Sequence, residues 1–483
     1  MISLLNYDEA ETGKTGERVL YHLLIDRITD FFCRNQSQRE LFSDIISAPL
    51  TDGGAVMNRQ DVLKDFLDSP ELLDGMYRLF DKFSELKKAH NNARKDDWRF
   101  SRDSDFGADF VIAKNLLSIN ALTLKKLFIL MKSISGFMSG FYFTSKPLKE
   151  LKASLDRVCQ AEEYEALLEI CTKFEMYSTS STLDFTAELD ETGRICKCEL
   201  IPHGNVRISE PTLKKKRRFF RGDDEPTYPC QSFFVGRSTS VSTILSAPLK
   251  NLSEVFSSIS SQIISLYSGI FKECCFYKAA LDYCRKLKEK GCQYVFPSVS
   301  DSGDTSIHGL RDIYLTLRAE SPDDVIPNDF NMLSKQNGIV VFGKNGGGKT
   351  VYLRSVGTAQ LFSQAGLPIP AEKAEICCFN TVLTQFSESE KDFKEGSDAG
   401  RFEQEVSEIS AIMDELSQNT LVLLNETFQT TAYDEGAEGL ADILNYFSSL
   451  KSKWILVSHI HQIKDFLPDT TLFRTFKDNY TIE

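Results

Sequence analysis

The stretch from Gly343 to Thr350 constrains the fold of this 483-residue chain more than any other. It reads Gly-Lys-Asn-Gly-Gly-Gly-Lys-Thr and matches the phosphate-binding pattern G-x-x-x-x-G-K-[ST] in full. The apolar run Ile339–Phe342 precedes it and predicts a buried strand, and apolar residues at helical spacing follow it. The pattern requires this context, because loop N–H groups and a helix N-terminus together favour an anion. We therefore predict a nucleotide site in a C-terminal α/β domain.

Each part of the loop has an expected role. The glycines let the backbone turn tightly around a phosphate, and they are Gly343, Gly346, Gly347 and Gly348. Lys349 would reach the β- and γ-phosphates, and the Thr350 hydroxyl would ligate Mg²⁺. Gly13–Thr15 also spells Gly-Lys-Thr, but Asp8 stands where the first glycine should be and no apolar strand precedes it. We predict a plain loop there.

Composition limits the class of protein. A net charge of −13 argues against a general polyanion binder, so any DNA contact would need a local basic patch. The twelve cysteines form no C-x-x-C ladder, which predicts reduced thiols in a cytoplasmic protein. The N-terminus lacks a charged signal-peptide region, and the apolar run Leu127–Phe143 is short and interrupted by Lys132. We expect a buried helix there and no membrane span.

The hydrophobic periodicity divides the chain into four predicted segments. Residues 1–180 are mainly helical, with periodic stretches at Val19–Phe32, Val62–Phe83, Ala113–Phe143 and Leu148–Phe174, and a loop at Asp103–Asp109. Residues 181–245 hold a hairpin and a basic loop, 246–292 a long helix, and 293–483 the nucleotide domain. The expected fold is therefore multidomain, with a mainly α-helical region followed by an α/β domain.

The two middle segments each leave two interpretations open. Thr182–Leu189 and Arg194–Ile201 alternate polar and apolar residues, which predicts the hairpin. The cluster Lys214–Arg221 could contact a phosphate backbone, or it could be a solvated loop neutralised by Asp223–Glu225. Apolar spacing over Asn251–Lys290 predicts a helix ~60 Å long, which could act as a lever or simply pack.

The nucleotide domain carries further predicted elements. Ser306–Leu317 suggests a strand pair, and Ala374–Phe386 gives another strand region. Leu421–Leu424 and Trp454–Val457 are short apolar runs typical of parallel strands. An amphipathic helix is marked by Val406, Ile409, Ile412, Met413 and Leu416. Its spacing would direct Asp414 and Glu415 to solvent, which excludes that acidic pair as a metal site.

The strand Leu421–Glu426 has the form of a Walker B strand, which normally ends in Asp-Glu. Here the first position is Asn425, which brings no charge to Mg²⁺, whereas Glu426 can orient the attacking water. We therefore expect weaker metal binding or slow hydrolysis. His459 ends the last apolar strand, where it could sense the γ-phosphate. His461 could make a metal pair with it, but no third ligand is near in the sequence.

The order of phosphate loop, Walker B strand and strand ending in His resembles the MutS family of mismatch-repair ATPases, within the ABC-type ATPases, over residues 320–465. Asp324–Phe330 resembles the segment that lies against adenine, which implies base contacts from Val325 and Ile326. Asn345 and Ser458-His459 also resemble family positions. The resemblance adds Gln385 as a candidate member of the metal shell.

The sequence also departs from the family. The family's Gly-Arg-Ser-Thr loop is Gly400–Glu403 here, and its Gly-rich turn after the Walker B strand is Thr427–Thr431. We find no Phe-x-Glu mismatch-reading domain and little room for DNA clamp arms. The resemblance implies a dimeric, ATP- and Mg²⁺-using ATPase that couples nucleotide state to double-stranded DNA binding in repair or recombination. The alternative is a nucleotide-gated protein scaffold with weak or no hydrolysis and no DNA binding.

Overall fold

The computed structural model describes residues 3–5, 10–100, 108–175, 184–189, 195–201, 239–386, 401–428, 433–477 and 479–483. Contacts divide the chain into two units. The first comprises Met1–Tyr77, Phe141–Leu151 and Ile270–Glu483, and the second comprises Arg78–Gly140 and Lys152–Gly269. These units differ from the four sequential segments predicted, because helices α5 (Pro70–Phe100), α7 (Lys146–Gln160) and α9 (Thr239–Glu289) contribute to both.

Within the described part of the first unit, five parallel strands form the main sheet, in the order β11 (Thr471–Thr475), β6 (Gly338–Phe342), β10 (Lys453–Val457), β9 (Thr420–Asn425) and β8 (Thr381–Phe386). Every residue of β6 and β9 is buried, as their apolar runs predict. A mainly helical region followed by an α/β domain is therefore confirmed. Because the strands are parallel, their carboxyl ends meet along one edge.

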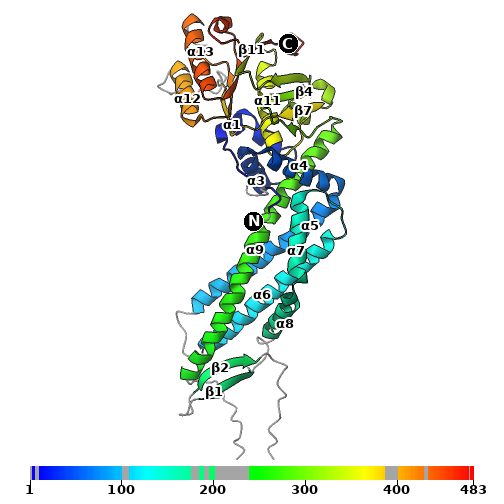
Figure 1. Ribbon diagram of the computed structural model, residues 1–483, viewed down its shortest axis with the longest axis vertical. Helices are drawn as coiled ribbons and strands as arrows, with labels where there is room; N and C mark the ends of the chain where they lie inside the picture. Colours follow the sequence, from blue (N-terminus) through cyan, green and yellow to red (C-terminus); the bar gives the residue numbers. More distant parts are fainter. Residues whose placement is uncertain are drawn as a thin grey trace, which may run out of the picture. The chain divides into compact units, whose positions relative to one another are not determined.

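Helices cover both faces of this sheet (Figure 1). Alternate strand residues such as Val340, Val422 and Trp454 pack on one face against α12 (Arg401–Glu415) and α13 (Tyr433–Ser449). Leu423 faces the other way, toward α11 (Lys349–Gln364), where a Cβ on Gly357 would lie 2.5 Å from the Leu423 side chain. That glycine therefore lets α11 lie close to the sheet.

The buried face of α12 differs from the one predicted. Ile409 and Ile412 are buried as expected, but Val406 is 43% exposed and Met413 38% exposed. Glu405 is buried in their place at 4% exposure, because its carboxylate accepts a hydrogen bond from the backbone N–H of Phe428. Asp414 and Glu415 are exposed, which confirms their predicted position on the solvent side.

A second sheet of the first unit contains, among the described residues, β3 (Ser298–Val299), β7 (Lys373–Ile376), β4 (Thr305–Leu310) and β5 (Asn328–Met332) in that order. The predicted strand pair over Ser306–Leu317 is only half correct. Its second part is helix α10 (Ile313–Arg318), where Asp312 caps the N-terminus by accepting from the Leu315 N–H. Ile313 and Leu317 are buried, four residues apart, as one face of a helix requires. Short 3-10 helices follow at Pro322–Asp324 and His461–Asp465.

The N-terminal residues pack into the same unit as the nucleotide domain. The helices are α1 (Glu17–His22), α2 (Ile25–Thr29), α3 (Gln36–Ser47) and α4 (Gly53–Asp68). The predicted stretch Val19–Phe32 is broken by Leu24, whose φ is 57°, and Val62–Phe83 is broken before Pro70. Gly13–Thr15 is a loop as predicted, with its Gly13 and Thr15 N–H groups bonded to the carbonyls of Pro49 and Ser47.

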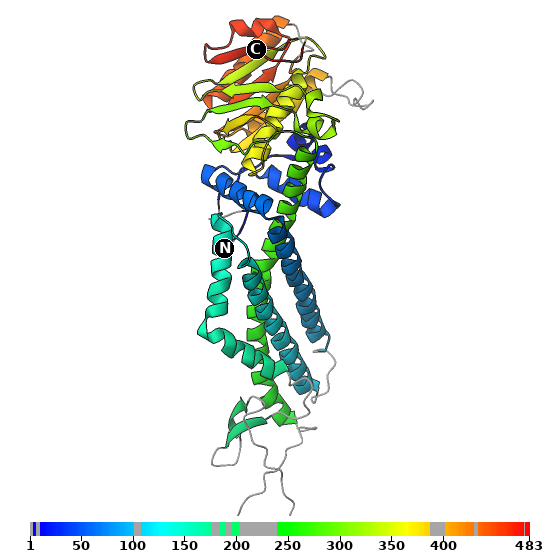
Figure 2. The same cartoon turned by 90° about the vertical axis from the view of Figure 1, so that its right-hand side faces the viewer.

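In the second unit, α6 (Ala108–Met138) and parts of α5 and α9 lie side by side (Figures 1 and 2). The Asn120 amide donates to the Ser253 hydroxyl at 2.9 Å, and the rings of Phe83 and Tyr267 stack at 5.0 Å. The predicted stretch Leu148–Phe174 forms two helices, α7 and α8 (Glu162–Glu175), with a break at Ala161. The hairpin is confirmed as antiparallel β1 (Asp184–Leu189) and β2 (Ile195–Ile201). Helix α9 is longer than predicted and contains Pro248.

The remaining predictions concern membrane spans, cysteines and segments that the structure does not describe. Among the described residues, no helix combines the length and apolarity needed to cross a membrane. Cysteines whose side chains are described are free thiols, in line with the predicted reduced state. The basic cluster Lys214–Arg221, the Asp103–Gly107 part of the predicted loop and Gly400 lie outside the described residues.

Candidate nucleotide site

The predicted phosphate loop connects β6 to α11 as the sequence pattern requires. Gly343, Gly346 and Gly348 have φ values of 151°, 75° and 95°, which L-residues rarely adopt. A Cβ on Gly343 would lie 2.8 Å from Phe476 Cβ, so both conformation and space require glycine there. Asn345 and Gly346 are exposed, and a Cβ on Gly346 would meet nothing within 4 Å. The loop is therefore closed on its inner side and open outward.

Lys349 begins α11 and directs its ammonium back into the loop. Its Nζ donates to the carbonyl oxygens of Gly343 and Lys344, both at 2.9 Å, and lies 3.2 Å from His459 Nε2. Burial lowers the pKa of Lys349, while the Glu426 carboxylate opposes that shift. The ammonium is thus enclosed by acceptors at the carboxyl edge of the sheet.

The other predicted phosphate-site residues gather around it. Thr350 Oγ1 donates to the amide oxygen of Asn425 at 2.9 Å. Glu426 Oε1 and His459 Nε2 are 3.2 Å apart. These contacts arise because β10 pairs with both β6 and β9, with Val457 opposite Val341 and Asn425. Lys349, Thr350, Asn425, Glu426 and His459 are therefore brought together as the sequence predicts.

A cavity of about 370 Å³ adjoins the loop at Gly346 and Gly348. Val325 and Ile326 line it, which places both predicted base contacts at one pocket. Three aromatic residues that sequence reasoning missed, Tyr352, Phe476 and Tyr480, also line it. Tyr352 has helical spacing and resembled an ordinary core residue, and no motif marks the other two. Phe476 reaches the pocket because its N–H bonds to the Phe342 carbonyl beside the loop.

Gln385, predicted for the metal shell, has protein partners in the structure. It is fully buried in β8, and its amide oxygen accepts from the Thr427 hydroxyl at 2.6 Å. Its amide nitrogen donates to Glu408 Oε2 at 3.2 Å. Gln385 therefore connects to the turn after the Walker B strand.

The rings of His461 and His459 have different partners. Its ring stacks on Phe342 with centroids 4.5 Å apart and planes 17° apart. No cluster of three or more His, Cys, Asp or Glu side chains suited to a metal occurs among the residues that the structure describes. His459 and His461 do line an open cavity of about 430 Å³ with Gln462 and Asp465. The histidine pair therefore borders open space.

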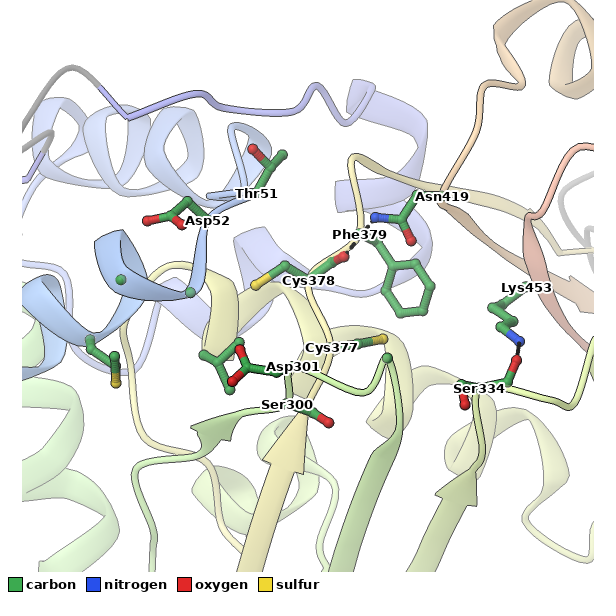
Figure 3. A pocket seen from close by; sticks show the side chains of 15 residues that line it. Thr51, Asp52, Ser300, Asp301, Ser334, Cys377, Cys378, Phe379, Asn419 and Lys453 are labelled. Atoms are coloured by element: carbon green, nitrogen blue, oxygen red, sulfur yellow. Dashed lines mark hydrogen bonds between the residues drawn. The ribbon is translucent and has the colours of Figure 1, made fainter.

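A larger cavity of about 620 Å³ lies at the opposite edge of the sheet (Figure 3). Phe379, Asn419 and Lys453 line it, and these residues come just before or begin β8, β9 and β10. The Lys453 ammonium donates a hydrogen bond to the Ser334 carbonyl at 2.6 Å. None of the predicted site residues lines this cavity. Since ligands of parallel sheets bind at the carboxyl edge, the cavity beside the phosphate loop is the candidate site.

Comparison with known proteins agrees with this geometry. Residues 339–477 match the family model for MutS domain V, and residues 51–290 match the model for the MutS2 N-terminal domain. The first match contains the phosphate loop, the Walker B strand and His459. The second covers a large part of the helical region. Both halves of the chain therefore point to the same family.

Individual relatives are distant. The protein named endonuclease MutS2 of Lactobacillus helveticus is 31% identical over 144 residues, which is 30% of this chain and 18% of the relative. Its namesake from Shouchella clausii is 28% identical over 191 residues, 39% of this chain and 23% of the relative. The DNA mismatch repair protein MutS of Chlamydia trachomatis is 28% identical over 233 residues, which is 44% of this chain and 28% of the relative. The chain thus spans less than a third of the length of each of these relatives, and it belongs to the MutS family.

Proposed function

We propose that this chain binds ATP with Mg²⁺ at the phosphate loop and hydrolyses it slowly. The observation that carries this proposal is the convergence of Lys349, Thr350, Glu426 and His459 at the carboxyl edge of the sheet. Lys349 and Glu426 both contact His459, and Thr350 follows Lys349 and donates to Asn425, the residue before Glu426. A cation, a hydroxyl, a carboxylate and an imidazole gathered in this way suit phosphoryl transfer to water.

The residues present fit a nucleotide. The Lys349 ammonium, held by two carbonyl oxygens of its own loop, is a ready donor for phosphate oxygens. The 370 Å³ cavity continues from the loop and offers Val325 and Ile326 to a base. The triphosphate would therefore lie along Gly343–Thr350, with its base in the adjoining cavity.

Mg²⁺ fits the pair formed by Thr350 and Asn425, since hydroxyl and amide oxygens are among its accepted ligands. When bound, Mg²⁺ would offset the charge of the phosphates. Glu426 would orient the attacking water and accept its proton, and His459, beside both Glu426 and Lys349, would sense the γ-phosphate. The Gln385 amide oxygen already accepts from the Thr427 hydroxyl, so a metal would have to use the remaining lone pair of that oxygen.

At the level of the whole protein, we propose a dimer in which nucleotide state changes the affinity for double-stranded DNA. Support comes from the names of the relatives, an endonuclease and a DNA mismatch repair protein, and from helix α9, which contributes to both structural units. The acidic balance and the uncharged Asn425 favour a second candidate, a nucleotide-gated scaffold that hydrolyses little and binds no DNA.

The assignment is tested by comparing Lys349→Ala with Lys335→Ala, which removes the same charge from an exposed position outside the phosphate loop. Lys349→Ala should abolish turnover and weaken ATP binding by at least ~100-fold, because the buried ammonium is lost. Lys335→Ala should stay within ~3-fold of the wild type on both counts. Equal turnover of the wild type and Lys349→Ala would reject the assignment.

A further inference from the structure

The turn that follows the Walker B strand has an unusual backbone. Glu426 and Phe428 have φ values of 60° and 59°, so two non-glycine residues flank Thr427 in the left-handed region. Such residues are strained, and they persist only where neighbouring contacts hold them. Glu426 is the residue that we propose orients the attacking water. Its position therefore depends on whatever fixes this turn.

Within the described part of the chain, each residue of the turn makes a hydrogen bond that helps to fix it. The Glu426 N–H donates to the Val457 carbonyl at 2.8 Å, which continues the pairing of β9 with β10. The Thr427 hydroxyl donates to the Gln385 amide oxygen at 2.6 Å, and both side chains are fully buried. The Phe428 N–H donates to Glu405 Oε2 of α12 at 3.0 Å. The turn is thus held by a strand on one side and by polar side chains on the other.

The acceptor on Gln385 is itself held in place. Its amide nitrogen donates to Glu408 Oε2, and Glu408 Oε1 pairs with Arg18 Nη2 at 2.5 Å. This chain of contacts fixes which end of the Gln385 amide faces Thr427, since the nitrogen is committed to a carboxylate. Only the oxygen can then accept from Thr427. The arrangement is therefore specific for a hydroxyl donor at position 427.

We propose that Gln385 and Thr427 are positioning residues, which hold the turn so that the Glu426 carboxylate stays beside His459. This inference rests on the proposed ATPase function and assigns Gln385 a role different from metal ligation. A positioning bond changes the rate of the step that uses Glu426, whereas a metal ligand changes the Mg²⁺ requirement. A misplacement of about 1 Å at such a group costs ~100-fold in rate.

The test uses Thr427→Val, which removes the hydroxyl with little change of shape, and Thr427→Ser, which restores it. Thr384→Val is the matched control. Thr384 is buried in the same strand as Gln385, and its hydroxyl bonds instead to His22 Nδ1 at 2.7 Å. This control loses a buried threonine hydrogen bond of similar cost without touching the turn. For each full-length variant we would measure kcat, the Kd for ATP, the Mg²⁺ concentration for half-maximal rate, and amide hydrogen exchange over residues 424–428.

We expect Thr427→Val to lower kcat by ~10- to 100-fold with the Kd and the Mg²⁺ requirement within ~3-fold of the wild type. Amide exchange over 424–428 should accelerate by roughly 10-fold, since a lost hydrogen bond is worth about 1 kcal/mol or more. Thr427→Ser and Thr384→Val should match the wild type in kcat and in amide exchange over residues 424–428. Gln385→Ala should repeat the Thr427→Val pattern, including the unchanged Mg²⁺ requirement.

Two results would overturn the inference. One is that Thr427→Val has the same amide exchange rates over residues 424–428 and the same kcat as the wild type. The other is a raised Mg²⁺ requirement in Gln385→Ala that Thr427→Val does not share, which would make Gln385 a metal ligand. Failure of the proposed function has a separate signature, namely wild-type turnover no higher than that of Lys349→Ala. In that case the exchange measurement alone still decides whether the two residues hold the turn.

Discussion

The hydroxyl of Thr350 donates to the amide oxygen of Asn425 at 2.9 Å, at the point where the first turn of α11 meets the end of β9. Asn425 is 6% exposed and occupies the position of an aspartate in an ordinary Walker B strand. The pairing brings together two of the oxygen ligands that we propose for Mg²⁺, without the negative charge of an aspartate. Charge and geometry at this site can therefore be varied separately.

Asn425→Asp should strengthen Mg²⁺ binding, because a carboxylate has the same shape as the amide and adds a charge next to the metal. A unit charge at ~4 Å and an effective dielectric of 20 is worth about 4 kcal/mol before desolvation is subtracted. We expect at least a ~10-fold lower Mg²⁺ concentration for half-maximal ATP binding, which is about 1.4 kcal/mol. Titration of ATP binding with Mg²⁺ measures it.

The matched control is Asn419→Asp, the same chemical change at the other end of β9 and at the opposite edge of the sheet. It should leave the Mg²⁺ titration unchanged. An equal shift in both variants would show that the gain is a general effect of negative charge.

Glu426→Gln should separate binding from hydrolysis. The amide keeps the size of the side chain but cannot accept the proton of the attacking water, so turnover should fall by ~100-fold or more. The Kd for ATP should stay within about threefold, because no positive contact to the phosphates is removed. Glu415→Gln, an exposed change in the Asp414-Glu415 pair on α12, is the control and should be silent. Lost turnover in Glu415→Gln would place the water-activating acid on α12 instead.

DNA binding is tested by salt dependence. If the chain contacts a phosphate backbone, affinity should fall steeply with salt, with a log–log slope of about −0.9 per phosphate contacted. Neutralising the basic residues of Lys214–Arg221 should flatten that slope, whereas neutralising the exposed Lys286 and Lys288 should not. Fluorescence anisotropy with and without ATP measures it. No binding at low salt in either state would leave the scaffold as the remaining candidate.

His22 predicts a pH dependence of stability. Burial, with the nearby charges of Arg18 and Arg354, lowers its pKa from 6.5 to about 4. The unfolded chain therefore binds a proton more readily, so stability is full above pH 6.5 and is lost as pH falls toward 4. By this linkage the wild type should lose about 2 kcal/mol between pH 7.5 and pH 5 through His22. Urea unfolding of the wild type and His22→Gln measures the difference.

The comparison isolates His22 from other buried groups. Burial raises the pKa of Asp312 to about 6, and this acts in the opposite direction, since that contribution is lost as pH rises through 6. Both proteins contain Asp312, so its effect cancels in the difference. An unchanged slope in His22→Gln would mean that the pKa of His22 is the same in the folded and the unfolded protein.

Much of the nucleotide domain could be predicted because its signals are local. Four consecutive apolar residues and a glycine-rich octapeptide specify β6, the loop and the start of α11 without help from distant residues. The same holds for Asn425, Glu426 and His459, which end apolar strands. Parallel pairing then brings strand ends together, so these side chains could be expected at one edge. The second strand predicted within Ser306–Leu317 was wrong, because alternation over a few residues also fits a short helix such as Ile313–Arg318.

The sequence by itself determined the phosphate loop, the strands that carry its partners, and the residue types available for chemistry, since each depends on neighbours within a few positions. Only the tertiary structure decided that Phe476 and Tyr480 line the cavity beside the phosphate loop, that Glu405 and not Val406 is buried, and that Gln385 accepts a hydrogen bond from Thr427. The N-terminal helices also join the nucleotide unit through contacts such as His22 with Thr384, 362 residues apart. Such contacts depend on the packing of whole elements against each other, and no local period in the sequence records them.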